Sequence, residues 1–110
     1  MSVYTTLGTI QLNEDQMKQE TFLQSLNDCL KIDQKEDIYE FKGNFEQGLL
    51  KQLNSMSSHD VDVLFDYYEI SIPNNYFMHE QVIYDTSKHV FKEIKKEPFI
   101  CDSTMLERFG

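Results

Sequence analysis

The sequence predicts an α+β fold: one small domain, residues 1–110, in which a short, mainly antiparallel sheet carries two to three helices packed on one face. A length of 110 residues fits one domain with a single core. The composition, 40% hydrophobic and 13% aromatic, is rich enough in apolar surface to offset the entropy of folding. Runs of β-forming residues also alternate with segments of helical periodicity, an order typical of α+β folds.

The chain is expected to begin with a strand and a helix. Residues 2–12 are rich in β-forming residues, and Asn13 with Gln16 three positions later resembles a helix cap. From about Glu14, apolar residues recur at helical spacing and form one buried face: Phe22, Leu23, Leu26, Cys29 and Leu30. This pattern predicts that Cys29 is a buried, unreactive thiol on the helix.

A second strand and a second helix are predicted next. Ile38, Tyr39 and Phe41 form the short strand, which Gly43 and Asn44 close. Asn44 then caps a helix, with Gln47 at its third position, although Gly48 weakens it. The apolar side of this helix would hold Phe45, Leu49, Leu50, Leu53 and Met56.

Residues 59–70, HDVDVLFDYYEI, fit two periodicities. As a strand, they would place on one face the side chains of Val61, Val63, Phe65 and Tyr67. As a helix capped by Ser57 or Ser58, they would bury Val61, Leu64, Phe65 and Tyr68. We expect the helix, because Asp is unfavourable inside strands and the serines stand where a cap belongs.

The last third is predicted to hold a turn at residues 73–75 and then a β-hairpin, QVIYDTSKHVFKEI, around residues 85–88. A helix starting at Ser87 is the alternative. The tail, residues 97–110, is expected to be irregular and to fray after docking Phe99, Ile100 and Met105.

Charge restricts the choice of partner. Nineteen acidic residues against ten basic ones give a net charge of −9. Nucleic acid is excluded as a direct ligand, and anionic membranes are disfavoured, because both are bound through neutralised phosphates. A basic protein, a cation or a metal remains. Residues 52–87 carry six acidic residues and no Lys or Arg, so the partner is expected at this segment.

This segment predicts a protein-binding surface, because interfaces combine aromatic centres with complementary charge. The expected partner-binding residues are Asp60, Asp62, Asp66, Tyr67, Glu69, Tyr76 and Phe77. The function this favours is an immunity- or antitoxin-type inhibitor that blocks the basic active site of a nuclease toxin. One alternative is a phage-type inhibitor that mimics DNA to block another nucleic-acid enzyme. Another is an oligomeric adaptor whose aromatics are core and whose acids only solubilise it.

Enzymatic chemistry is not expected. His59-Asp60 resembles the His-Asp pair of metal-dependent phosphohydrolases, which makes a small metal-binding or hydrolase domain using His59, Asp60 and Asp62 the remaining alternative. The glycines lack the spacing of a phosphate-binding loop, and neither cysteine has the positive surroundings of a nucleophile. We therefore expect no cofactor, no bound metal and no catalytic residue.

A cytoplasmic location is expected. The chain starts without the basic and apolar pattern of a signal peptide and lacks the roughly 18 consecutive apolar residues of a membrane-spanning helix. Its two cysteines are accordingly expected to be reduced.

Overall fold

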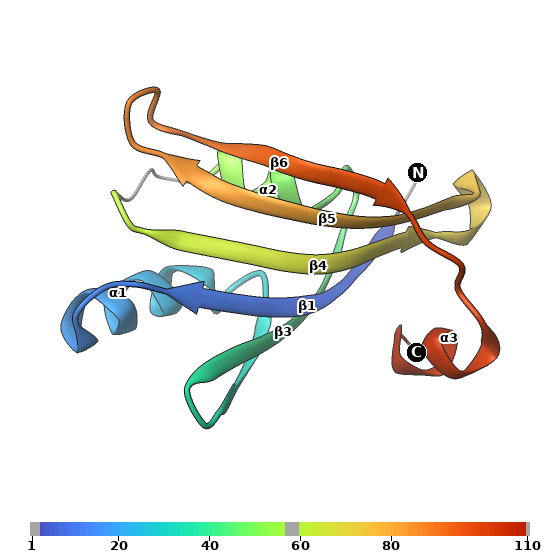
Figure 1. Cartoon of the computed structure of the whole chain (residues 1–110), viewed down its shortest axis with the longest axis horizontal. Helices are drawn as coiled ribbons and strands as arrows, with labels where there is room; N and C mark the ends of the chain where they lie inside the picture. Colours follow the sequence, from blue (N-terminus) through green and yellow to red (C-terminus); the bar gives the residue numbers. More distant parts are fainter. Residues whose placement is uncertain (1–2, 57–59, 110) are drawn as a thin grey trace.

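The computed structural model describes residues 3–56 and 60–109, which form an antiparallel six-stranded sheet in the order β2-β3-β1-β4-β5-β6 (Figure 1). The strands are β1 (Tyr4–Leu12), β2 (Lys31–Lys35), β3 (Ile38–Phe45), β4 (Val63–Ser71), β5 (Tyr76–Asp85) and β6 (Val90–Pro98). The helices are α1 (Gln16–Leu26), α2 (Leu49–Asn54) and α3 (Ser103–Phe109), with a single 3-10 turn at Ile72–Asn74. Within the described residues, no helix combines the length and the apolar character needed to cross a membrane.

The α+β class is confirmed, but the sheet is larger than predicted. The first strand, the first helix and the hairpin of β5 and β6 lie where the sequence places them, so the alternative helix at Ser87 is wrong. Strand β2 was not predicted, because Lys31, Asp33 and Lys35 are exposed and give the segment no apolar period. It forms by pairing with β3, from Lys31 opposite Lys42 to Lys35 opposite Ile38.

The helix expected at 59–70 is wrong: this segment enters β4, which pairs with β1 on one side and β5 on the other. Its alternate residues Val63, Phe65 and Tyr67 are buried. Burial of that face and pairing on both sides outweigh the poor strand propensity of Asp66. The expected caps Ser57 and Ser58, like His59, lie outside the described residues.

Two other helix predictions need correction. The second helix begins at Leu49 rather than beside Asn44, because residues 44 and 45 pair with β1 and extend β3. Cys29 follows α1 in a turn and is half-buried there; burial raises the pKa of its thiol.

The C-terminal tail is more regular than expected. Strand β6 runs to Pro98, and residues 103–109 form α3, whose Phe109 is buried. Of the residues predicted to dock, Phe99 packs edge-on to Tyr68, with ring centroids 4.8 Å apart, whereas Ile100 is 90% exposed.

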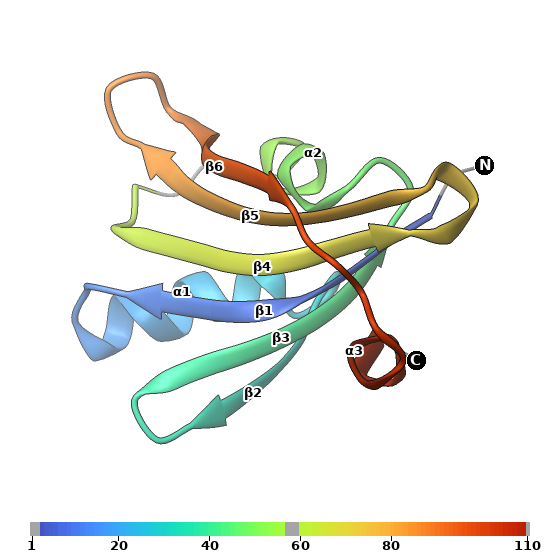
Figure 2. The same ribbon diagram turned by 45° about the vertical axis from the view of Figure 1, so that its right-hand side comes forward.

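The helices cover the two faces of the sheet unequally. Both α1 and α2 lie behind the sheet in Figures 1 and 2, on what we call the helix face. The segment that follows β6 crosses the opposite side, the open face, and ends in α3 there (Figure 2). The predicted placement of the helices on one face therefore holds for α1 and α2 only.

The core fills the helix face. Phe65 is its centre, with three other phenylalanine rings at 5.8–6.4 Å in edge-to-face geometry. The buried side chains contributed by the sheet include Ile10, Phe41, Val63, Phe65, Tyr67, Val82 and Phe91, and those from the helices include Phe22, Leu26, Leu49 and Leu53. The curved sheet and its two helices thus enclose one core (Figure 2).

One side chain joins α2 to the outer strand of the sheet. The Asn54 amide donates to the Phe91 carbonyl oxygen at 3.0 Å and accepts from the Phe91 N–H at 2.8 Å. We expect Asn54→Ala to lower the free energy of unfolding by about 1–2 kcal/mol, because both backbone groups lose their partner. Urea unfolding measures this loss, and Gln52→Ala on the same helix is the control expected to change it little.

Candidate functional site

The structure distributes the predicted partner-binding residues over three places. Because successive side chains of a strand point to opposite faces, Asp66 lies on the open face while Tyr67 and Glu69 lie on the helix face. On β5, Phe77 lies on the open face and Tyr76 on the helix face. Asp60 and Asp62 precede β4, at one end of the sheet. The seven residues therefore do not form one surface.

The first place is an acidic group at the end of the sheet where β1 stops and β4 starts. The Asn13 N–H donates to the Asp62 carbonyl oxygen at 3.0 Å, and the Asn13 amide donates to the Asp62 carboxylate at 3.0 Å. Asp15 caps α1 by accepting from the Lys18 N–H at 2.8 Å. We call the four carboxylates collected here the acidic end: Glu14, Asp15, Asp60 and Asp62.

Little positive charge is available within the acidic end. Lys18 forms an ion pair with Glu14 at 2.7 Å, and the pKa of Lys18 is raised by that hydrogen bond and by the charges of Glu14, Asp60 and Asp15. His89, from the turn between β5 and β6, approaches Asp60 at 3.3 Å, and the side chain of Asp60 stays 65% exposed. Among residues 3–56 and 60–109, these four carboxylates thus share one lysine and one histidine.

Glu14 and Asp15 were not among the predicted binding residues. They stand 45 positions or more before Asp60 and outside the base-free segment 52–87 from which the binding residues were predicted. The antiparallel pairing of Leu12 with Val63 brings the two segments together. The signal that could have found them is the position of Asp15 directly before the helix, where an aspartate is a preferred cap, and not Asn13, which was predicted as the cap.

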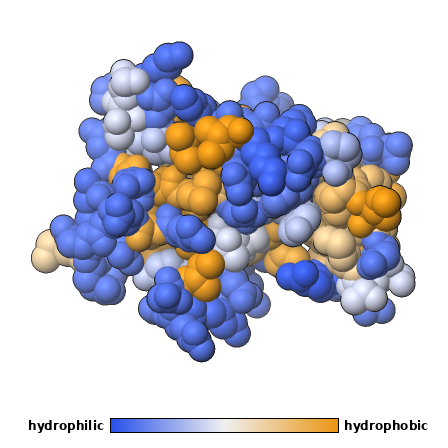
Figure 3. Space-filling view, in the orientation of Figure 1, coloured by the Kyte–Doolittle hydropathy of each residue, from blue (hydrophilic) through white to orange (hydrophobic). Residues whose placement is uncertain are grey.

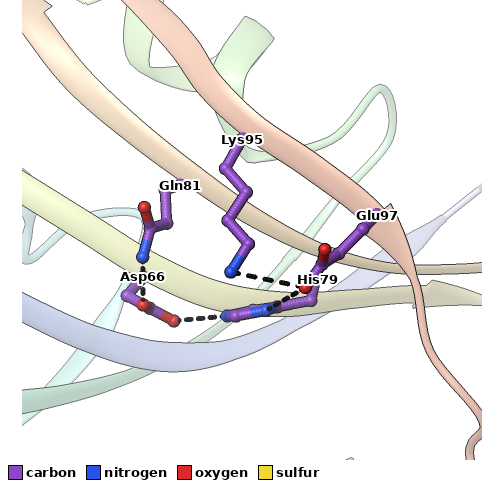
Figure 4. Close-up of polar contacts among 5 residues, drawn as sticks. All are labelled: Asp66, His79, Gln81, Lys95 and Glu97. Carbon is purple, nitrogen blue, oxygen red and sulfur yellow. Dashed lines mark hydrogen bonds and ion pairs between the residues drawn. The ribbon is translucent and has the colours of Figure 1, made fainter.

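The second place is a polar cluster on the open face, drawn in Figure 4. His79 on β5 contacts Asp66 on β4 at 2.7 Å through Nε2, and its Nδ1 lies 3.8 Å from Glu97 on β6. Gln81 donates to Asp66 at 2.7 Å, and Lys95 lies 3.3 Å from Glu97. Burial opposes ionisation of Asp66, but the bonds from His79 and Gln81 outweigh it and lower the pKa of this carboxyl.

Aromatic rings adjoin this cluster. Tyr68 stacks on His79, with centroids 4.6 Å apart, and Phe99 packs edge-on to Phe77 at 6.3 Å. Figure 3 shows hydrophobic side chains left of the centre and toward the right-hand edge of this side of the molecule, with hydrophilic ones between them. Asp66 and His79 contact each other and side chains on neighbouring strands. These contacts connect β4, β5 and β6.

The third place is the interior of the helix face, where acidic and tyrosine side chains are buried together. Glu80 is 3% exposed and accepts from the Tyr67 hydroxyl at 2.7 Å and from the Tyr76 hydroxyl. Glu69 is 5% exposed and accepts at Oε2 from the Leu49 N–H at 2.9 Å and from the Thr6 hydroxyl at 3.2 Å. Burial and the proximity of Glu80 raise the pKa of both tyrosines above its ordinary value.

Burial, and less strongly the charge of Glu80, raise the pKa of Glu69 to about 7, although its hydrogen bonds act in the opposite direction. A buried carboxyl with a pKa near neutrality is typical of functional sites. Glu69 was predicted on a binding surface, which is wrong in that the side chain is buried, and Glu80 was not among the predicted residues. The alternation of β4 is the signal for the burial of Glu69, because it puts Glu69 in phase with Phe65 and Tyr67.

The metal-binding alternative finds no supporting geometry in the described residues, among which no group of three or more His, Cys, Asp or Glu side chains could hold a metal ion. His59 lies outside those residues, while Asp60 and Asp62 contact His89 and Asn13. The hydrolase alternative therefore stays a prediction.

Comparisons with family models, with curated proteins and with solved structures found no match to this chain, so its function has to be argued from the three places described above.

Proposed function

We propose that this protein is an acidic inhibitor of the immunity or antitoxin type, which uses the acidic end to bind the basic active site of a nuclease. One observation supports this most directly: four carboxylates from two distant segments meet at one end of the sheet, where the positive partners among the described residues are one ion-paired lysine and His89. Nuclease active sites are built to attract phosphates, and carboxylates on a rigid frame can take the place of phosphates.

The frame of the acidic end suits this role. Asp15 is fixed as a helix cap, and Asp62 is fixed by two hydrogen bonds with Asn13. A preorganised group loses little conformational entropy on binding, which favours tight complexes. The net charge of −9 adds long-range attraction toward a basic partner and speeds the encounter.

The double variant Asp60→Lys, Asp62→Lys is expected to lose the partner. Reversing two charges at a charge-complementary interface slows association, and we expect the association rate constant to fall about tenfold or more at low salt. The tagged protein would first capture its partner from a lysate of its native cells, with elution by a salt gradient. Surface plasmon resonance with the purified partner then compares the variants.

The matched control is Asp33→Lys, Asp37→Lys, which makes the same change of charge at the exposed hairpin of β2 and β3. This control is expected to retain most of the association rate. Equal loss in both double variants would mean that only total charge matters and would contradict the assignment to the acidic end. A captured enzyme that binds DNA but is not a toxin would instead favour the DNA-mimic alternative.

A further inference from the structure

A cavity of about 490 Å³ lies on the helix face, between α2 and the strands β4, β5 and β6. Its volume is in the range of pockets that hold small molecules. The polar residues that line it include Glu69, Tyr76, Glu80, Glu93, Lys96 and Lys51. Leu50 and Gly48 supply apolar wall from the start of α2. This cavity is separate from the acidic end.

Glu69 reaches the cavity with one oxygen uncommitted. Its Oε2 accepts both hydrogen bonds, from Leu49 and Thr6, and among the described residues no donor to Oε1 is found. Gly48 makes room beside Oε1, because a Cβ at this position would lie 2.8 Å from that oxygen. The φ angle of Gly48, +93°, is also one that other residues rarely adopt. A nearly buried carboxylate oxygen therefore stands at the wall with acceptor capacity left.

Glu80 adds negative charge to the same wall. Its two oxygens accept hydrogen bonds from the hydroxyls of Tyr67 and Tyr76. Glu80 is itself 3% exposed, so solvent screens its charge poorly. The cavity thus has a fixed anionic side made of two carboxylates on adjacent strands.

The positive charge of the lysines that line the cavity does not balance the negative charge of its acidic side chains. Lys96 lies over the ring of Tyr76, with Nζ 5.1 Å from the centroid, and Lys51 reaches the cavity from α2. Glu93 brings a third carboxylate, so three acidic side chains face two lysines when all are ionised. One negative charge remains in excess. Both lysines are exposed residues whose flexible side chains can move toward solvent.

We propose that this cavity is a binding site for a small organic monocation, a primary ammonium or a guanidinium, with Glu69 as its principal charge partner. The free Oε1 accepts a hydrogen bond from the ligand cation, Glu80 supplies a second negative charge, and the Tyr76 ring offers its face to the cation. Lys96 now occupies the position over that ring and is displaced toward solvent when the ligand enters. The excess negative charge and the open Oε1 of Glu69 favour a cation over an anionic ligand.

n-Butylamine and n-butylguanidine are suitable probes, with n-butanol and butyrate as neutral and anionic controls of similar length. Titration at pH 8 is followed by the NMR shifts of the backbone amides of Gly48 and Leu49, which adjoin Glu69. The two cations are expected to shift both amides with saturation, and the two controls are not. Equal shifts from butanol and butylamine would overturn the proposal, because they would show apolar binding.

Two variants test the assigned roles in opposite directions. Glu69→Gln keeps an oxygen for Leu49 and Thr6 but removes the charge, and it is expected to weaken butylamine binding about tenfold or more. Lys96→Met removes the resident cation and is expected to tighten binding several-fold. Glu97→Gln, a charge change on the open face, is the matched control and should leave the affinity unchanged. Unaltered affinity in Glu69→Gln would refute the site.

The pH dependence provides a further readout. With a pKa of about 7, Glu69 is largely protonated at pH 5.5, and the excess negative charge disappears. The groups that face it are Thr6 on β1, Glu80 and Tyr76 on β5, Glu93 and Lys96 on β6, and Lys51 on α2. Butylamine binding is therefore expected to weaken between pH 8 and pH 5.5 in the wild-type chain and to stay weak in Glu69→Gln. Equal binding at both pH values in the wild type would contradict the role of Glu69.

Discussion

Replacing Glu69 by Gln is expected to change the free energy of unfolding in a pH-dependent way. The difference between variant and wild type should be about 3 kcal/mol more favourable to the variant at pH 8 than at pH 4. The pKa of Glu69 rises from 4.5 in the unfolded chain to about 7 in the folded one. Between these values the folded state holds more protons than the unfolded state, so stability falls as the pH rises. A difference of about 2.5 pH units, at about 1.4 kcal/mol per unit, gives roughly 3 kcal/mol.

The amide that replaces the carboxyl in Glu69→Gln does not titrate, so this loss of stability is absent from the variant. The measurement is urea unfolding of both chains at several pH values from 4 to 8, with the difference in free energy of unfolding plotted against pH. Carboxyl groups that do not interact with Glu69 contribute equally to both chains and cancel in the difference. Glu46→Gln, at an exposed position, is the control expected to give a flat difference. A flat difference for Glu69→Gln would mean that its carboxyl is not buried as described.

Tyr67→Ala and Tyr68→Ala are expected to differ greatly in stability, although the two residues are neighbours. Tyr67 is fully buried on the helix face, and truncation there should cost roughly 3–5 kcal/mol, the range of large aromatic-to-alanine changes in cores. Tyr68 lies half-exposed on the open face, so the loss should be about 1 kcal/mol, from its contacts with His79 and Phe99.

Thermal unfolding followed by circular dichroism compares the two variants. Tyr67→Phe serves where the alanine variant does not fold, because it keeps the ring and removes only the hydroxyl that bonds Glu80. It should still lose about 1–3 kcal/mol, since the Glu80 oxygen is left without that donor. In the helix once expected at 59–70, Tyr68 would be core and Tyr67 exposed. A larger loss for Tyr68→Ala would therefore argue against β4.

The sequence predicts those parts of the fold that carry a local signal. Residues 16–26 have one apolar face, and residues 81–94 have two β-rich runs around a turn, and both elements are confirmed, although Asp15 rather than the predicted Asn13 caps the helix. The local sequence of β4 fits both a helix and a strand, and only the pairing of β4 with β1 and β5 decides for the strand. Strand β2 has no apolar pattern of its own, so its position depends entirely on β3.

The candidate site was less predictable, because charge in the sequence does not say which face a residue occupies. Asp66 and Glu69 stand three positions apart, yet one lies on the open face and the other is buried beside α2. Glu14 joins Asp62 through the pairing of two distant strands, which no local pattern encodes. Alternation along β4 was available, and with the strand alternative it would have placed Tyr67 and Glu69 inside.

The contact between Asn54 and Phe91 also bears on self-association. Strand β6 is an edge of the sheet, and an unpaired edge offers N–H and carbonyl groups to a strand of another molecule. The Asn54 side chain occupies both groups of Phe91, and further along the same edge the chain carries Lys92, Lys95 and Lys96. Glu93 and Glu97 lie on the same strand, and charged side chains on an edge disfavour its pairing with another copy. We therefore expect the Asn54 amide and the charged side chains of β6 to oppose strand addition at this edge of the sheet.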